Sequence, residues 1–261
     1  MKKILSALAL TLCLTLVCAL ALGEITVTKK DMVLNRNLDK NVNNILVLIQ
    51  DGEATQTLMI ASVNSRTGRS VMTQIDCDAM VNIPEIGDMP LSQVYAQGAP
   101  KSRGLLVART VNQLLDLNVS TYVALNLSSL PELVDEIGQL STWLNDEEAE
   151  ILGTWAGDNV LTSENILDYV NIRLEEDYVE KDRAYMVFMD LLKQGLRSSG
   201  GANLMGLGKK LLSSMDTNLN ALAAVTMLSS FQGGDDRREL ALTSNMTAEE
   251  MRAAFYREVY E

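Results

Sequence analysis

Hydrophobic and polar positions follow a strand-like pattern where the main domain begins. Residues 45–49 (ILVLI) form a continuous apolar run that ends at Gln50-Asp51-Gly52, which is typical of a strand buried on both faces that stops at a turn. Two further strands are predicted over residues 57–64 and 70–76, and the short polar segment between them indicates a hairpin. The domain is therefore expected to open with three strands.

Helical periodicity appears next and then gives way to a further strand. Leucines and valines recur at helical spacing between residues 101 and 115, and residues 122–127 are predicted to be a strand. Ser129-Leu130-Pro131-Glu132 matches a capping box with a proline near the helix start, which predicts a helix through residue 137. Because strands and helices alternate, the pattern predicts an α/β fold: a single-domain αβα sandwich with a mixed central sheet.

The second half of the chain is predicted to be mainly helical. Residues 138–161 hold both tryptophans and show no sustained period, so we expect them to be irregular. The other predicted elements are helices over residues 162–170, 182–196 and 219–231, a short strand over 239–243, and a last helix capped by Thr247 and Glu250.

The first 23 residues have the pattern of an export signal. Lys2 and Lys3 precede an almost wholly apolar run over residues 4–22, which ends in small residues. A run of this length could also span a bilayer, which takes about 17–25 residues, so cleavage and retention as a membrane anchor both remain open. We expect an exported protein, either secreted or held at the extracellular face of the cytoplasmic membrane. The expected divisions are residues 1–23 (signal or anchor), 24–43 (polar lead-in), 44–245 (main domain) and 246–261 (C-terminal helix).

Composition narrows the possible chemistry. The chain has 261 residues and no histidine, which excludes Ser-His-Asp catalysis and histidine-bound zinc, and leaves hard cations such as Mg²⁺ for any metal chemistry. Its formal net charge of −12 argues against a nucleic-acid partner, because such partners need clustered Lys and Arg. Two of the three cysteines lie in the export segment, so Cys77 has no partner for an internal disulfide in the exported part.

Five motifs occur in order along residues 44–173. They are NILVLIQD at 44–51, TLMIASV at 57–63, VNIP at 81–84, LSQVYAQGAP at 91–100 and LTSENILDYVNIR at 161–173. In order and spacing they resemble the motifs NILLLGSD, TMMLVSV, VDIP, LNAAYAYGGP and LTGEQALAYVRIR of the LytR-CpsA-Psr family of exported cell-envelope proteins. The resemblance extends to about Thr243.

The resemblance implies a membrane-proximal phosphotransferase whose apolar pocket holds a polyprenyl phosphate or pyrophosphate lipid. In the family, aspartates hold Mg²⁺ on the pyrophosphate, arginines bind its oxygens, and a glycopolymer passes to peptidoglycan at the membrane surface. Phosphoryl transfer depends mainly on positioning and charge neutralisation, so this residue set suits the reaction. Carried over position by position, the resemblance implies Asp51 as metal ligand, Arg173, Arg183 and Asp78 as catalytic residues, and Arg173, Arg183 and Asp177 as substrate contacts.

Several positions depart from the family pattern, and most of the departures remove positive charge. Ala54-Thr55-Gln56-Thr57 stands where the family has R-S-D-T, and Asp76-Cys77-Asp78 stands where it has P-R-D. Pro90, Asn171 and Glu180 replace further cationic residues. Each lost charge-assisted contact to a buried phosphate could remove about 1.5–3 kcal/mol of binding. Activity is therefore expected to be weak or absent, and Mg²⁺ binding is in doubt.

The retained residues also have ordinary interpretations. Asp51 could cap a turn, Asp78 could end a strand, and Arg173 and Arg183 could form surface ion pairs with nearby acidic residues. Three hypotheses remain open: a diverged phosphotransferase, a non-catalytic module that binds a polyprenyl lipid or supports envelope assembly, and a secreted structural domain that has kept only the fold.

Overall fold

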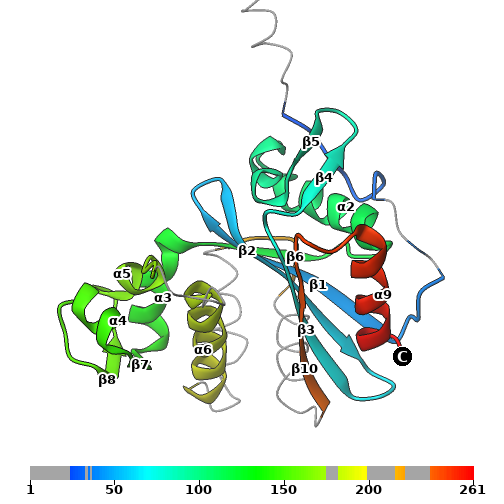
Figure 1. Cartoon of the computed structure of the whole chain (residues 1–261). Coiled ribbons are helices and arrows are strands. Elements are labelled where there is room, and N and C mark those ends of the chain that lie inside the picture. Colours follow the sequence, from blue (N-terminus) through cyan, green and yellow to red (C-terminus); the bar gives the residue numbers. More distant parts are fainter. Residues whose placement is uncertain (1–23, 33–34, 36, 175–181, 199–214, 221–235) are drawn as a thin grey trace, which may run out of the picture.

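A six-stranded mixed sheet forms the centre of the computed structural model, which describes residues 24–32, 35, 37–174, 182–198, 215–220 and 236–261 (Figure 1). The strand order is β10-β3-β2-β1-β6-β9. The strands are β1 (Val42–Asp51), β2 (Ala54–Asn64), β3 (Arg69–Ile75), β6 (Tyr122–Asn126), β9 (Met215–Thr217) and β10 (Asp236–Leu242). β1 runs antiparallel to β2 and parallel to β6, and β10 runs parallel to β3, so the predicted mixed sheet is confirmed.

Both faces of the central strands are buried, as the apolar run at residues 45–49 predicts. Leu46 and Leu48 face one hydrophobic core, and Val47 and Ile49 face the other. The first core includes side chains of α2 (Arg103–Leu115) and α9 (Ala248–Val259), and the second those of α3 (Leu130–Ile137), α5 (Ile166–Val170) and α6 (Arg183–Ser198). Figure 1 shows α9 and α6 on opposite sides of the sheet. The predicted sandwich is therefore confirmed.

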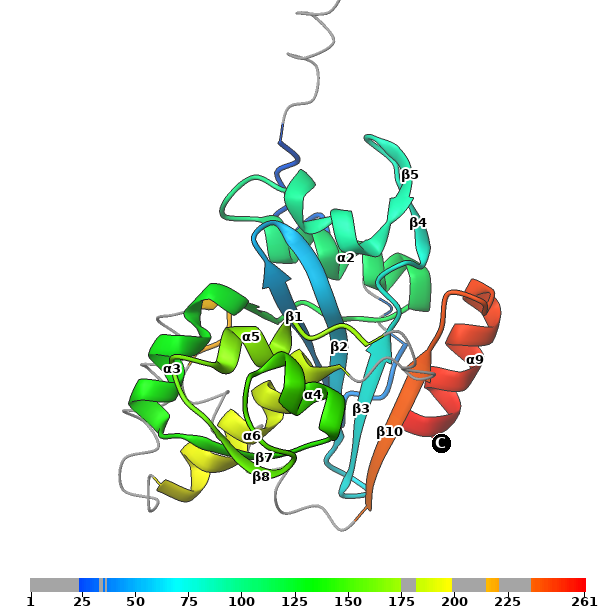
Figure 2. The same cartoon turned by 60° about the vertical axis from the view of Figure 1, so that its left-hand side comes forward.

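Residues 138–161 are more regular than predicted. They form β7 (Leu140–Leu144), α4 (Asp146–Ile151) and β8 (Gly157–Leu161), with β7 and β8 paired antiparallel. The expectation of irregular structure was wrong because each element is short and only widely spaced residues, such as Leu140, Leu144 and Leu161, are buried. Asn145 and Glu148 form a capping box for α4. With η3 (Leu127–Ser129), α3 and α5, these elements make up a lobe, here called the 127–172 lobe, which lies beside α6 (Figure 2).

One predicted capping box and one predicted helix start are corrected. The capping box at Ser129 is absent, because the Ser129 hydroxyl donates to the Asn126 carbonyl (2.6 Å) instead of capping α3. The helix expected from residue 162 begins at Ile166, because the Asn165 side chain accepts a hydrogen bond from the Thr162 N–H (2.7 Å) in a preceding turn. The capping box of the last helix, Thr247 with Glu250, is confirmed.

The remaining described elements lie before α2 or at the ends of the chain. β4 (Met80–Ile83) and β5 (Gly87–Pro90) pair as a hairpin and precede the short helices η1 (Leu91–Gln93) and η2 (Tyr95–Gln97). The polar lead-in contributes Val27, Met32 and Leu38 to the first core. Most of the predicted helix at 219–231 and all of residues 1–23 lie outside the described residues. In the part that is described, no helix combines the length and the apolar character needed to cross a bilayer.

Candidate functional site

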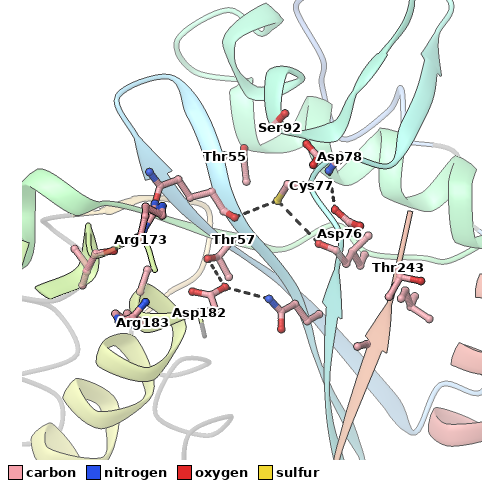
Figure 3. Close-up of a pocket in the computed structure, with 17 residues that line it drawn as sticks. Thr55, Thr57, Asp76, Cys77, Asp78, Ser92, Arg173, Asp182, Arg183 and Thr243 are labelled. Carbon is pink, nitrogen blue, oxygen red and sulfur yellow. Dashed lines mark hydrogen bonds between the residues drawn. The ribbon is translucent and has the colours of Figure 1, made fainter. Parts of the chain in front are cut away.

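A cavity of about 610 Å³ lies where β2, β3 and β10 meet the start of α6 (Figure 3). Arg173, a predicted substrate contact that follows α5, lines one side of the cavity. Asp76 and Asp78 lie across from it. Most of its described lining residues are polar, including Thr55, Gln56, Thr57, Gln74, Cys77 and Ser92. The apolar lipid pocket implied by the family resemblance therefore stays a prediction.

Asp182 joins the base of the cavity to the sheet. Its Oδ2 accepts hydrogen bonds from Thr57 Oγ1 (2.6 Å) and Gln74 Nε2 (3.1 Å), and Figure 3 shows it facing Thr57. Its Oδ1 accepts from the N–H of Tyr185 (2.8 Å), which caps the first turn of α6. The carboxylate thus fixes the start of α6 against β2 and β3. Sequence reasoning did not single out Asp182, although an aspartate just before a predicted helix is a signal for an N-cap.

Arg183 is held at the same base by a buried ion pair. Its Nε (3.0 Å) and Nη2 (2.8 Å) both donate to Glu148 Oε1, and its Nη1 donates to the Ile172 carbonyl (3.2 Å). Arg183 is 3 % exposed and Glu148 is fully buried. Arg183 lines the cavity as predicted, but its charge is balanced by a carboxylate of the 127–172 lobe. Its predicted role toward a phosphate stays a prediction.

Arg173 lies at the exposed rim of the cavity, just after α5. Its Nη1 donates to the carbonyls of Val170 (3.2 Å) and Ile172 (3.0 Å), which orients the guanidinium. Within residues 37–174 and 182–198, no acidic side chain forms an ion pair with Arg173. Its forked donors can therefore meet an anion in the cavity without displacing a carboxylate of these described segments.

Asp76 and Asp78 follow β3 on the other side of the cavity. Burial alone would raise the pKa of Asp76, but hydrogen bonds from Ser244 (2.8 Å) and from the Asp78 N–H (2.9 Å) outweigh it and lower that pKa. Asp76 is therefore an anion at neutral pH. Asp78 lines the cavity and is exposed, so it stays available as a candidate catalytic residue.

Cys77 stands between these aspartates as a half-buried thiol. Burial, together with the negative charges of Asp182, Asp76 and Asp78, raises its pKa to about 12. Its Sγ lies 3.4 Å from the Gln56 carbonyl oxygen. A neutral thiol in an acidic setting is a poor nucleophile.

Asp51, the predicted metal ligand, lies next to the cavity at the end of β1. It is exposed, and its Oδ2 accepts a hydrogen bond from Nε2 of Gln56 (3.2 Å), a residue that lines the cavity. In the described part of the chain, no group of three or more Cys, Asp or Glu side chains could hold a metal ion by itself. Asp177 lies outside the described residues, so its predicted substrate contact has no structural description.

Of the charge departures at described positions, two lie in this cavity: Gln56, where the family has an aspartate, and Cys77, where it has an arginine. Thr55, Gln56 and Cys77 line it, whereas Ala54 and Asn171 are exposed outside the lining. With Arg183 balanced by Glu148, the described lining sets the single cation of Arg173 against three aspartates. The cavity can present hydrogen-bond donors and one arginine to an anion, but little net positive charge.

Comparison with known proteins identifies the family of the chain. The model of the LytR_cpsA_psr family matches residues 22–259 of the chain. Biofilm regulatory protein A of Streptococcus mutans is 24% identical over 247 residues, covering 82% of this chain and 60% of that protein. The polyisoprenyl-teichoic acid–peptidoglycan teichoic acid transferase TagU of Oceanobacillus iheyensis is 23% identical over 208 residues, covering 75% of this chain and 64% of that protein. The chain thus spans about three fifths of the length of these relatives.

Solved structures share the fold. TagT bound to LI-WTA superposes with a TM-score of 0.68 at 16% identity, covering 90% of this chain and 99% of that chain. TagT with bound octaprenyl pyrophosphate lipid gives a TM-score of 0.66 at 16% identity, with the same coverage. The fold, the order of the motifs and the match over residues 22–259 agree, and the chain therefore belongs to the LytR-CpsA-Psr family.

Proposed function

We propose that this protein is an exported cell-envelope member of its family that binds a polyprenyl phosphate or pyrophosphate lipid. It transfers, weakly or not at all, the glycopolymer that the lipid carries. Its named relatives include teichoic acid–peptidoglycan transferases, and TagT has been solved with octaprenyl pyrophosphate. The observation that carries the proposal is the cavity between β2–β3 and α6. Of its two described lining arginines, Arg183 is balanced by Glu148, whereas Arg173 pairs with no described carboxylate. Peptidoglycan or a glycopolymer and the membrane surface are the expected partners.

Charge favours binding over turnover. Phosphoryl transfer proceeds by neutralising the negative charge that spreads over the phosphate oxygens, and one arginine in that role can be worth about a thousandfold in rate. Arg173 can bind phosphate oxygens through its forked donors. Asp76, Asp78 and Asp182 line the same cavity and would repel the phosphate. A single arginine can hold a lipid headgroup, but it gives the transition state little stabilisation.

Magnesium would reduce this repulsion if it entered with the ligand. Mg²⁺ is usually bound by one or two carboxylates together with substrate phosphates and water, rather than by a site built wholly from protein. Asp78, which is exposed and lines the cavity, fits that mode, and Asp51 beside Gln56 is the alternative. A bound Mg²⁺ would supply charge neutralisation on the phosphates.

The test combines lipid identification with a turnover assay on the full chain. The protein is purified from membranes in mild detergent, its lipids are identified by mass spectrometry, and release of phosphate from polyprenyl pyrophosphate is followed with and without Mg²⁺. We expect a polyprenyl phosphate lipid to co-purify, and turnover at or slightly above a protein-free blank. Arg173→Ala should lose the lipid. The control variant is Arg66→Ala, which changes an exposed arginine in the β2–β3 turn and should keep the lipid.

Two results would overturn the proposal. If no polyprenyl lipid co-purifies and none binds when added, the protein has kept only the fold. If rapid Mg²⁺-dependent turnover occurs, the remaining cations are sufficient for catalysis and the protein is an active transferase.

A further inference from the structure

The paired strands β7 and β8 of the 127–172 lobe leave one face uncovered. On the buried face, Leu140 pairs with Leu161, whereas on the opposite face Trp143 pairs with Asp158 and Ser141 with Val160. Trp143 is 63% exposed and Val160 is 47% exposed. In an antiparallel pair, residues opposite and diagonal to one another on one face are neighbours. Trp143 and Val160 therefore form an apolar strip on the surface of the lobe.

The loop that leads into β8 adds a second exposed tryptophan. Trp155 is 72% exposed, and Ile151 at the end of α4 is 54% exposed. The loop is held in place because Asn159 Nδ2 donates to the Trp155 carbonyl (2.7 Å) and Asn159 Oδ1 accepts from the Thr154 hydroxyl (3.1 Å). Both tryptophans of the chain thus lie on this lobe, exposed and on fixed backbone. Large exposed apolar side chains gathered in one region are typical of interaction surfaces.

The charge of the lobe decides what can bind there. Residues 127–172 hold ten of the chain's 34 acidic residues and none of its 22 basic residues, so the rest of the chain carries 24 acidic and 22 basic residues. Glu148 is buried against Arg183, and the other nine acidic side chains are exposed. Nearly all of the net charge of −12 is therefore concentrated on this lobe. Such a surface repels anionic lipid headgroups and phosphate-rich polymers and attracts cations.

We propose that the exposed face of β7–β8, with Trp143, Trp155 and Val160, docks a lysine- and arginine-rich segment of a partner protein. The acidic surroundings would steer the segment to the lobe, and its cationic side chains would lie over the indole rings. A cation over a tryptophan is worth about 0.5–1 kcal/mol at an exposed site, and tryptophans are frequent among the residues that dominate binding energy. The lobe lies on the other side of the molecule from α9 and the C-terminus (Figure 1), and this surface is separate from the cavity lining.

The test uses the tryptophans themselves as reporters. Because the chain holds only two, one on the exposed face of β7–β8 and one in the loop before β8, intrinsic fluorescence of the full chain reports on this part of the lobe. The probe is deca-lysine, titrated at 0.05 M and 0.15 M salt, with a chitin-type N-acetylglucosamine tetramer and anionic phospholipid vesicles as the competing probes. We expect a saturable fluorescence change with deca-lysine alone, weaker at the higher salt because ions screen exposed charges.

Matched charge reversals separate a local surface from the overall charge. Glu150→Lys with Asp158→Lys changes the lobe, and Glu249→Lys with Glu261→Lys makes the same charge change at α9 and the C-terminus. Calorimetry should show deca-lysine binding about tenfold weaker in the lobe variant and altered by less than about twofold in the α9 variant. Trp155→Ala should weaken it by about two- to fivefold, which corresponds to one lost cation–aromatic contact.

Four results would overturn the proposal. Absence of deca-lysine binding would do so, as would equal weakening in the two charge-reversal variants, which would reduce the effect to net charge. A saturable response to the neutral saccharide without one to deca-lysine would make the face a glycan platform. Binding of the anionic vesicles would make it a membrane contact.

Discussion

The base and the rim of the cavity each carry one arginine that the family resemblance marked for phosphate binding, and the two sit in opposite surroundings. At the base, Arg183 is buried and donates to Glu148 and the Ile172 carbonyl. At the rim, Arg173 is exposed, and among the described residues it is oriented by the carbonyls of Val170 and Ile172. The comparison teaches that a matching motif position identifies a location in the fold, whereas the neighbours decide whether a charge supports the structure or remains available to a ligand.

Removing the base arginine should give the largest effect. Arg183→Met removes the guanidinium that pairs with the buried Glu148 carboxylate, and breaking a buried pair from one side costs about 3–5 kcal/mol of stability. Urea denaturation of the folded protein measures this loss. Adding Glu148→Gln removes the buried negative charge and keeps an oxygen that accepts from the Asn145 N–H, so the double variant should recover at least half of the lost stability. A stable Arg183→Met protein that has lost lipid binding would reverse the roles assigned to the two arginines.

Adding a cation to the cavity should sharpen the comparison in the other direction. Cys77→Arg places a guanidinium in the cavity lining and should strengthen polyprenyl pyrophosphate binding by at most about 1.5–3 kcal/mol. Pairing of the new arginine with Asp76 and Asp78 reduces this gain. Ala54→Arg adds the same charge at an exposed position outside the lining and serves as the control. Calorimetric titration of both variants measures the difference. Equal gains would show that the cavity is not where the phosphate binds.

The hydrogen bonds that fix the base can be tested with a smaller change. Thr57→Val removes the hydroxyl that donates to Asp182, and loss of a hydrogen bond to a charged group should lower the unfolding free energy by about 1.5 kcal/mol. Thr57→Ser keeps the hydroxyl and loses only a buried methyl group, so it should cost about 0.8 kcal/mol. If the two variants are equally stable, Asp182 does not depend on this bond.

The smallest effect concerns the neutral thiol of Cys77, which lies beside Asp76 and Asp78 across the cavity from the two arginines. In the folded protein the pKa of Cys77 is near 12, above its ordinary value of 9.0. Above pH 9 the thiol therefore keeps its proton in the folded state but releases it in the unfolded state. Stability should therefore fall as the pH rises through 9. Between pH 7 and pH 10, the Cys77 thiol should lower the unfolding free energy of the parent protein by about 1 kcal/mol, and Cys77→Ala should not show this decrease. Denaturation of both proteins at pH 7 and pH 10 measures the difference, and identical pH dependence would contradict the raised pKa.

Local patterns in the sequence were sufficient for the regular core. The apolar run at residues 45–49 and the capping box of Thr247 and Glu250 each involve residues that are close together in the sequence. β1 and α9 could therefore be predicted. β7, α4 and β8 were missed because each is short and buries only one or two side chains.

The candidate site could be located from the sequence, but its bonding could not be predicted. The resemblance brought Asp51, Asp78, Arg173 and Arg183 to one part of the fold, and the structure places all four in or beside the cavity. The partners that set their roles are distant along the chain: Glu148 lies 35 residues from Arg183, and Thr57 lies 125 residues from Asp182. Such pairings arise only when β2, α4 and α6 pack together, so no local period or spacing reveals them.

The most direct measurement determines the polyprenyl pyrophosphate affinity and the unfolding free energy of Arg173→Ala side by side with the parent protein. If the rim arginine is the ligand contact, affinity should fall at least about tenfold, as expected for a lost charge-assisted hydrogen bond, while stability changes by less than about 0.5 kcal/mol. Unchanged affinity, or a stability loss as large as that of Arg183→Met, would contradict the division between a structural base and a ligand-binding rim.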